Sequence, residues 1–256
     1  MQFSLCIDSI YPKDNVKEKL EKIKQAGFKF IEFWDWRDKD FNLIMNSGLK
    51  VSNFSGNRIS SLTLDDKEKV IQEVNASIDA AKRLKCGHMM LLSDILEGDG
   101  SVKINSISSE KKLLHLYDNL RILVEVAKKR EMMLVIEPLN TFKDHKNYFL
   151  DNFQITLELV KAVNSENLKV LYDMYHMQIM EGNVLETLQK YHQFIGYIHA
   201  ANVPYRCEPW TGELDFRFIF KQLSEIYSGF VGFEFFVKGK DFTYRKLYEW
   251  IQSINF

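Results

Sequence analysis

Short apolar runs alternate with longer amphipathic segments along the whole chain. Most of these runs hold four or five mostly apolar residues, and this continuous hydrophobicity predicts strands that are buried on both faces. The strands are predicted at residues 3–7, 30–34, 50–54, 88–92, 132–136, 168–172, 195–198 and 230–233. Between them, apolar residues recur at helical spacing, as Leu20, Ile23 and Ala26 do. Helices are therefore predicted at residues 13–26, 41–45, 65–84, 110–129, 152–163, 183–191, 214–226 and 243–251.

The strict alternation of strand and helix predicts an α/β protein with a parallel sheet, because parallel neighbours need a crossover connection. Eight strand–helix pairs in 256 residues fit a closed (β/α)8 barrel, a TIM barrel, that forms one domain over residues 1–256. The alternative is an open, doubly wound sheet. It is disfavoured because no glycine-rich phosphate loop follows the first predicted strand.

Composition narrows the class of partner. The chain has 34 Lys and Arg against 35 Asp and Glu, so its net charge of −1 provides no general attraction for nucleic acid or an anionic membrane. Its three cysteines are far apart and predict neither a disulfide framework nor a zinc site. The first residues lack the pattern of a signal peptide, and no apolar run approaches the roughly 18 residues of a membrane span. A cytoplasmic protein with a small-molecule partner is expected, and a homo-oligomer is left open.

Metal-ligating side chains follow the last four predicted strands, one after each. They are Glu137, Asp173, His199 and Glu234. The carboxyl ends of barrel strands form the active-site face, so these groups are expected to converge. Three carboxylates so close together would repel one another, and a divalent cation would relieve that repulsion. Three hard oxygen donors and an imidazole suit Mn²⁺ or Mg²⁺, with Co²⁺ and Zn²⁺ as alternatives.

Taken one at a time, these residues have simpler interpretations. A single Asp or Glu after a strand is typically a helix cap or a turn former. A lone His among apolar neighbours is typically a structural residue. Four such residues at matching positions on consecutive strands are harder to explain independently, and this favours the joint metal site.

Longer motifs carry a family resemblance. The segments IEPLNT, YFLDN, NLKVLYDMYHMQIMEGN, VPYRCEPWTGELDF and GFEFF resemble the hydroxypyruvate isomerase group of the xylose isomerase-like barrels. The resemblance is dense from about residue 131 to residue 234. In the first half of the chain it is thinner and depends on AGFKFIEFWDW and on the barrel rhythm.

The resemblance implies roles for six residues. The metal ligands would be Glu137, Asp173, His199 and Glu234, and the first and last of these would also be the paired acid–base catalysts. His176 and Arg206 would bind substrate. From the residues alone, His176 could instead be a polar packing residue, and Arg206 could form a surface pair with Glu208.

Two departures from the family pattern bear on the substrate. Hydroxypyruvate isomerases tend to have Gln at the position of His199, whereas ketose 3-epimerases have His there. After the last glutamate the family often reads Tyr-x-Pro, and this chain reads Phe235-Phe236-Val237. The expected enzyme is a metal-dependent isomerase that moves a proton between adjacent carbons of a small α-hydroxycarbonyl compound through an enediolate. The substrate would be hydroxypyruvate, tartronate semialdehyde or a related sugar.

Three alternatives remain. The nearest is a ketose 3-epimerase. An endonuclease IV-type phosphodiesterase would need more histidines at strand ends and a basic surface. A non-catalytic sugar-binding barrel would not need the glutamate pair.

Further residues have weaker interpretations. Glu32, inside an apolar strand, is interpreted as a buried partner of an Arg or a His. Trp34 and Trp36 are interpreted as core residues or as an apolar wall of the pocket. Glu213 is expected to support Arg206 or a loop. Three histidines in helix or loop segments are expected at the surface: His115, His145 and His192.

Overall fold

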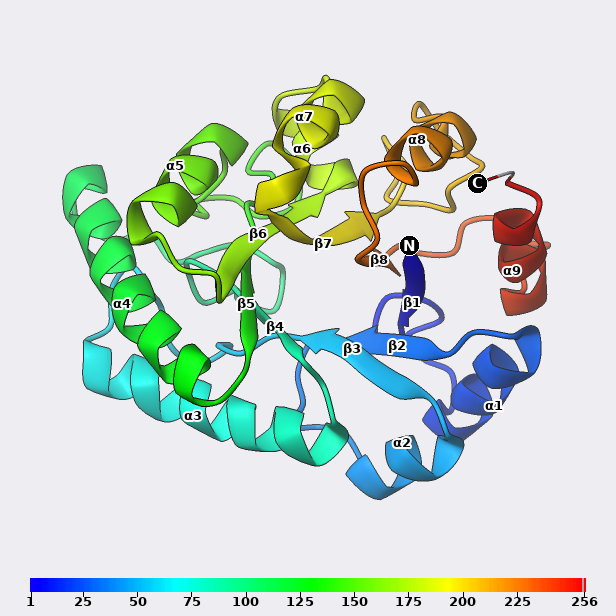
Figure 1. Cartoon of the computed structure of the whole chain (residues 1–256), viewed down its shortest axis with the longest axis horizontal. Helices are drawn as coiled ribbons and strands as arrows, with labels where there is room; N and C mark the ends of the chain where they lie inside the picture. Colours follow the sequence, from blue (N-terminus) through cyan, green and yellow to red (C-terminus); the bar gives the residue numbers. More distant parts are fainter. Residues whose placement is uncertain (255) are drawn as a thin grey trace.

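Within residues 1–254 and 256, which this computed structural model describes, eight strands form one sheet in which all pairings are parallel (Figure 1). The strands are β1 (Gln2–Cys6), β2 (Phe30–Phe33), β3 (Lys50–Phe54), β4 (His88–Leu91), β5 (Met133–Ile136), β6 (Leu168–Asp173), β7 (Ile195–Ala200) and β8 (Phe230–Phe233). Their order in the sheet is β3-β2-β1-β8-β7-β6-β5-β4. Because β1 pairs with both β2 and β8, the first and last strands of the chain meet.

The sheet closes between β3 and β4 through a narrower connection. Ser55 and Met90 form an isolated parallel bridge, and the Gly56 N–H donates to the Met90 carbonyl at 2.7 Å. The result is a nearly closed (β/α)8 barrel, which confirms the predicted fold class over the open-sheet alternative.

Helices surround the barrel in chain order (Figure 1). They are α1 (Val16–Ala26), α2 (Phe41–Ser47), α3 (Lys67–Leu84), α4 (Ser109–Lys129), α5 (Phe153–Val163), α6 (Met174–Met180), α7 (Val184–Tyr191), α8 (Phe216–Leu223) and α9 (Tyr244–Gln252), with a 3₁₀ turn, η1 (His192–Phe194), after α7. Helix α6 and the 3₁₀ turn are absent from the sequence prediction. Helix α8 is shorter at both ends than the predicted span 214–226.

The core lies between the strands and the inner faces of the helices. The periodic residues Leu20, Ile23 and Ala26 of α1 are buried, as the amphipathic pattern predicts. Gly27 ends this helix with φ of 111°, a left-handed conformation that glycine adopts at little cost. Among the described residues, no helix is both long and apolar enough to cross a membrane.

Candidate metal centre and active site

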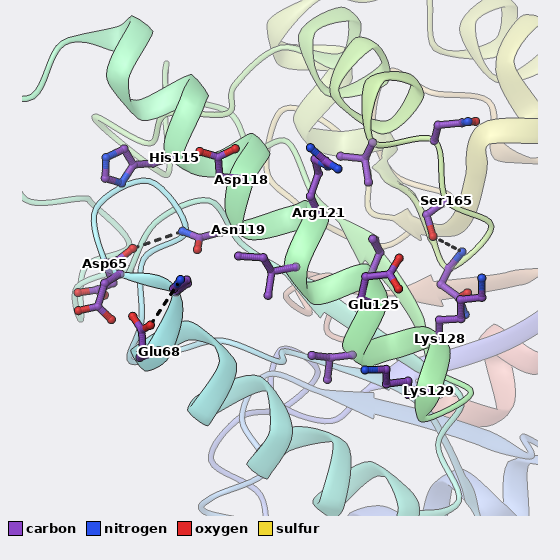
Figure 2. A pocket seen from close by; sticks show the side chains of 18 of the residues that line it. Asp65, Glu68, His115, Asp118, Asn119, Arg121, Glu125, Lys128, Lys129 and Ser165 are labelled. Carbon is purple, nitrogen blue, oxygen red and sulfur yellow. Dashed lines mark hydrogen bonds and ion pairs between the residues drawn. The ribbon is translucent and has the colours of Figure 1, made fainter.

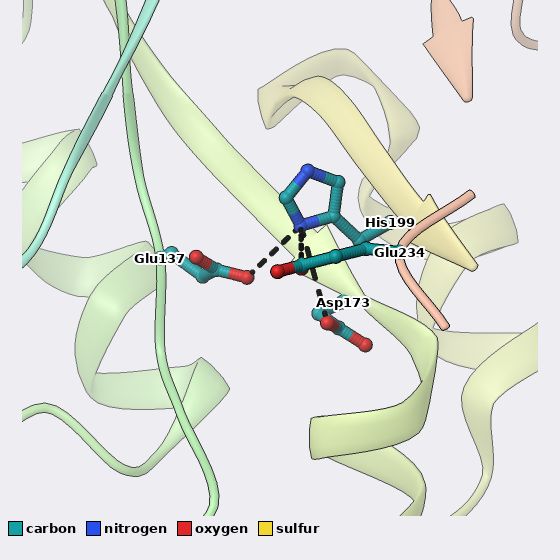
Figure 3. A group of neighbouring side chains, drawn as sticks. All are labelled: Glu137, Asp173, His199 and Glu234. Carbon is teal, nitrogen blue, oxygen red and sulfur yellow. Dashed lines mark hydrogen bonds and ion pairs between the residues drawn. The ribbon is translucent and has the colours of Figure 1, made fainter. Parts of the chain in front are cut away.

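Figure 3 shows four side chains that converge from neighbouring strands. Glu137 directly follows β5, Asp173 ends β6, His199 lies near the end of β7 and Glu234 directly follows β8. Each is buried and offers one ligand atom, and these four atoms lie within 4.8 Å of one another. The structure thus brings together the four residues that the sequence pattern singled out; their role as metal ligands stays a prediction.

The imidazole of His199 stands at the centre of this group. Its Nδ1 lies 3.0 Å from Glu234 Oε2, 3.2 Å from Glu137 Oε1 and 3.9 Å from Asp173 Oδ2. One nitrogen therefore faces all three carboxyl groups, as it would if the four atoms shared one ion.

Asp173 combines a structural role with this convergence. Its Oδ1 accepts the backbone N–H groups of Tyr175 at 2.7 Å and His176 at 3.2 Å, so it caps the N-terminus of α6. Its Oδ2 is buried and, among the described residues, has no hydrogen-bond partner. A buried carboxylate oxygen without a partner is costly and usually has an unseen one. The helix-cap interpretation of Asp173 is thus correct for one oxygen, and the other is available to a cation.

The donor set fits a hard divalent ion. Three carboxylates and one imidazole match the preference of Mn²⁺ and Mg²⁺ for oxygen, and the buried, unpartnered oxygen of Asp173 faces the same point. Co²⁺ and Zn²⁺ accept the same donors.

The pKa values of the four clustered residues shift in different directions. Burial raises the pKa of the Glu137 carboxyl to about 7, with the His199 imidazole opposing the shift. Burial likewise raises the pKa of Asp173. For Glu234, burial acts in the same direction, but the Arg206 guanidinium and the His199 imidazole outweigh it and lower the pKa. For His199, burial acts to lower the pKa, and the surrounding carboxylates outweigh it and raise the pKa well above its usual value.

Glu234 is held from two sides. Arg206 Nη2 lies 3.0 Å from its Oε2, and the indole N–H of Trp34 donates to its Oε1 at 2.5 Å. The alternative pairing of Arg206 with Glu208 at the surface is wrong. Glu208 is buried and accepts the backbone N–H groups of the loop after β8, Lys238 at 2.9 Å and Gly239 at 2.7 Å. Arg206 is also mostly buried, with its guanidinium over the Tyr175 ring.

The neighbours of His176 define the tautomer of its imidazole. Both the backbone N–H and the side-chain amide of Asn140 lie against its Nδ1, at 3.3 Å and 2.6 Å. Because those groups are donors, we assign Nδ1 as the acceptor and place the proton on Nε2, which lies 3.5 Å from Asp173 Oδ2. Burial lowers the pKa of His176 well below its usual value, which favours the neutral ring.

A cavity of about 410 Å³ opens over the cluster. Its lining includes five residues that the sequence brought forward: Trp34, Glu137, His176, Arg206 and Glu234. It also includes three basic residues that received no role from the sequence: Arg58, Lys143 and His145. Each of the three lies in a loop that follows a strand, which is the signal that could have identified them.

The prediction that His145 is a surface group is wrong. The residue is half-buried, its Nδ1 lies 2.9 Å from the Gly100 carbonyl, and its ring packs 5.2 Å from that of His176. The loop after β5 folds back over the barrel mouth, so a histidine that looks solvent-exposed in the sequence reaches the cavity. His192 is also half-buried, but it lies on the 3₁₀ turn after α7 and does not line the cavity; its Nδ1 is 2.9 Å from the Gln189 carbonyl.

The structure also shows where Glu32, Trp36 and Glu213 lie, the residues with weaker sequence interpretations. Glu32 is buried and lies 3.4 Å from His199, so it is the partner of a histidine as expected. Trp36 donates to the Ser77 hydroxyl at 2.9 Å and packs against the core, away from the cavity lining. Glu213 is exposed, and its backbone N–H supports the loop by donating to the Val203 carbonyl at 3.1 Å.

A larger groove of about 1140 Å³ runs along the outside of α4, between α3 and the end of α5 (Figure 2). Its lining is mostly charged and polar side chains, and His115 lies at one end of it. None of the four clustered residues borders this groove, so the smaller cavity is the candidate active site.

The family follows from comparison with known proteins. A model of the xylose isomerase-like TIM barrel family matches residues 20–254. The chain therefore belongs to the xylose isomerase-like TIM barrels.

Relatives of similar length place the chain among isomerases. It is 31% identical to a putative hydroxypyruvate isomerase of Drosophila melanogaster, over 94% of this chain and 92% of that protein. It is 28% identical to the hydroxypyruvate isomerase of Escherichia coli K12 (92% and 93%) and 26% identical to a 2-oxo-tetronate isomerase of Haemophilus influenzae (88% and 90%). The chain is an enzyme of this isomerase and epimerase class.

Solved structures share the fold. A protein described as AP endonuclease, family 2, from Brucella melitensis superposes with a TM-score of 0.85 at 23% identity, covering 98% of both chains. The 3-keto-D-glucoside 4-epimerase of E. coli superposes with a TM-score of 0.81 at 21% identity, covering 99% of both. At these identities the likeness concerns the barrel alone.

Proposed function

We propose that this chain is a divalent-metal-dependent isomerase that interconverts hydroxypyruvate and tartronate semialdehyde, or a closely related hydroxycarbonyl acid. The observation that carries the proposal is the pair Glu137 and Glu234. Both line the same cavity, and both approach His199 Nδ1 within 3.2 Å. Moving a proton between adjacent carbons needs a base and an acid at one bound substrate, which two such carboxyl groups provide. The relatives named hydroxypyruvate isomerase support the same substrate class.

In the proposed reaction, one glutamate removes a proton from the hydroxyl-bearing carbon beside the carbonyl, which gives an enediolate. The other delivers a proton to the former carbonyl carbon, and the hydroxyl proton passes between the two oxygens. Arg206 and Trp34 hold the Glu234 carboxyl in one orientation during this transfer. The Nε2–H of His176 donates to a substrate oxygen.

A cation fits at Glu137, Asp173, His199 and Glu234, and it would supply Lewis-acid stabilisation of the negative charge that develops on the substrate oxygens. Mn²⁺ or Mg²⁺ is the proposed ion, with Co²⁺ or Zn²⁺ as substitutes. The protein residues orient the substrate, keep the proton acceptor beside the reacting carbon and exclude water from the barrel mouth.

Arg58 favours an acid as the substrate. Arg58 lines the cavity and forms no ion pair within 4.0 Å among the described residues, whereas Arg206 is occupied by Glu234. The loop that carries Arg58 is fixed by Glu73, which accepts the backbone N–H groups of Arg58 at 2.7 Å and Ile59 at 3.0 Å. A cation on a fixed loop is suited to bind the carboxylate of hydroxypyruvate.

Replacing Arg58 by Gln should raise KM for hydroxypyruvate about 10- to 100-fold and change kcat little, because a hydrogen bond to a charged group is worth about 1.5–3 kcal/mol. KM for dihydroxyacetone, a neutral analogue in which a hydroxymethyl group replaces the carboxylate, should not change. Arg58→Lys should recover part of the loss, and Arg121→Gln, in the outer groove, is the matched control. Equal effects on the acidic and neutral substrates would show that Arg58 does not bind a carboxylate.

The affinity of the metal-free protein for Mn²⁺ should rise with pH. Burial raises the pKa of Glu137 to about 7 and the surrounding carboxylates raise that of His199, so a cation must displace protons from both. Below these pKa values the affinity should increase about tenfold per pH unit for each proton displaced. Calorimetric titration at pH 6, 7 and 8 measures this slope, and a flat profile would contradict the ligand assignment.

A ketose 3-epimerase is the second candidate, favoured by the histidine at position 199. Both reactions remove a proton from a carbon beside a carbonyl, and they differ in where the proton returns. Incubation in deuterium oxide with Mn²⁺ and a panel of hydroxypyruvate, tartronate semialdehyde and free ketoses separates them. Deuterium at the carbon beside the carbonyl, with conversion of hydroxypyruvate to tartronate semialdehyde, supports the leading proposal. Label at C3 of a ketose supports the epimerase, and no exchange in any compound rejects both.

A further inference from the structure

Glu32 lies in β2 inside the barrel, next to the metal cluster but outside its four residues. Its Oε1 is 3.4 Å from Nε2 of His199, on the opposite side of the imidazole from Nδ1, which faces the three carboxyl groups. Both of these facing atoms are buried, and neither has another hydrogen-bond partner in residues 1–254 and 256. Glu32 and the unshared nitrogen of His199 are therefore each other's available partners.

Residues on several other strands hold the Glu32 carboxyl group in place. Its Oε2 accepts the hydroxyl of Tyr197 from β7. That hydroxyl lies 2.8 Å from Ser52 Oγ on β3, which in turn donates to Ser4 Oγ on β1 at 2.7 Å. On β8, Gly232 leaves the space that the Glu32 carboxyl occupies, because a Cβ there would collide with both carboxyl oxygens. This arrangement fixes the carboxyl group in one orientation.

We propose that Glu32 is a positioning residue that sets the tautomer and the ring orientation of His199 for metal binding. A neutral imidazole has one N–H donor and one lone-pair nitrogen, and only the lone pair binds a metal. By accepting the Nε2–H, Glu32 leaves the lone pair on Nδ1, the nitrogen that faces Glu137, Asp173 and Glu234. The inference rests on the proposed metal site and does not depend on the identity of the substrate.

A purely structural role explains this arrangement less well. A buried carboxyl group is costly, and an apolar side chain of similar volume in the same place is often neutral or stabilising. Here the Tyr197 hydroxyl donates to one oxygen of the Glu32 carboxyl, and Gly232 leaves space for the group. The other oxygen of Glu32 therefore faces the imidazole of His199, a proposed metal ligand. Partners of this kind orient metal-binding histidines in other proteins.

The first test is the protonation pattern of His199 in the wild-type protein loaded with diamagnetic Zn²⁺ or Mg²⁺. Long-range proton–nitrogen NMR should show the proton on Nε2 and none on Nδ1. A proton on Nδ1, or failure of the metal-free protein to bind Mn²⁺, Mg²⁺ or Zn²⁺, overturns the proposal.

The second test is the affinity of metal-free variants for Mn²⁺, measured by electron paramagnetic resonance of the free ion. In Glu32→Gln, the Tyr197 hydroxyl should retain the amide oxygen, which leaves the NH₂ group facing His199 and favours the wrong tautomer. The affinity should fall about 10- to 100-fold, as it does when other such partners are removed. Tyr197→Phe should weaken binding less, since Glu32 keeps its contact with His199 and loses only its anchor.

A matched control separates this effect from general damage. Asp94 is a buried carboxylate outside the cluster that accepts the hydroxyls of Ser93 at 2.6 Å and Thr63 at 2.5 Å. Asp94→Asn should lower the thermal midpoint without changing the Mn²⁺ affinity. Wild-type Mn²⁺ affinity in both Glu32→Gln and Tyr197→Phe would overturn the proposal. None of these measurements uses turnover, so a chain that fails to isomerise hydroxypyruvate could still show the expected tautomer and affinities.

Discussion

Replacing Glu234 by Gln is expected to lower kcat by about 10²- to 10⁴-fold, the range that a positioned acid or base contributes. Gln preserves the shape of the side chain, and its one carbonyl oxygen can keep the contact with either Arg206, which lies 3.0 Å from Oε2, or Trp34, which donates to Oε1 at 2.5 Å. It cannot carry the transferred proton. Glu137→Gln should cause a loss of similar size, since the proposed reaction needs both groups.

The assay should use Mn²⁺ at a saturating concentration, because both glutamates are also proposed ligands. Substrate binding, measured by calorimetry, should persist in the variants while deuterium exchange disappears. Glu213→Gln, at an exposed position in the loop after β7, is the control and should behave as wild type. A variant that keeps full turnover would remove that glutamate from the mechanism. Binding without turnover in the wild type would favour a sugar-binding barrel.

Removing divalent ions with a chelator should abolish turnover and lower the thermal stability. The cluster places three carboxyl groups and an imidazole within 4.8 Å in a buried site. A cation that binds the folded chain at 100 times its Kd stabilises it by about 2.7 kcal/mol, which corresponds to about 5–10 °C in a domain of this size. Adding Mn²⁺ to the metal-free protein should therefore raise the thermal midpoint by that amount and restore activity.

Asp173→Asn is the informative companion. It can still cap α6 through its side-chain oxygen, but it replaces the carboxylate whose Oδ2 lacks a partner within the described part of the chain. In this variant the rise in thermal midpoint on adding Mn²⁺ should shrink or disappear. The midpoint of the metal-free variant should differ less from that of the metal-free wild type. Full activity after exhaustive chelation would refute the metal centre.

The barrel could be predicted because its signal is local and repeated. Most of the buried strands are short apolar runs, the longer helices show a helical period, and such an alternation of strands and helices favours a parallel α/β sheet. Short helices gave a weaker signal. Helix α6 was missed because it starts immediately after β6: Asp173 is the last residue of the strand, and its side chain caps the helix.

The active-site loops were harder to interpret. Arg58 and His145 carry no recognisable pattern in the sequence, and they reach the cavity only because the loops after β3 and β5 fold over the barrel mouth. For Arg58 that course depends on Glu73, a residue of α3 that accepts the loop's backbone N–H groups. Contacts of this kind join segments whose spacing follows no period.

For this chain, residue order alone was sufficient for the barrel and for the convergence of Glu137, Asp173, His199 and Glu234. The reason is that parallel strands in a β/α repeat all deliver their carboxyl ends to one face. Tertiary structure decided which residues surround these four. Arg206 pairs with Glu234, and Tyr197 donates to Glu32, although Glu32 and Tyr197 are 165 residues apart in the sequence. Such pairings depend on which side chains meet across the closed barrel, and packing in three dimensions determines that.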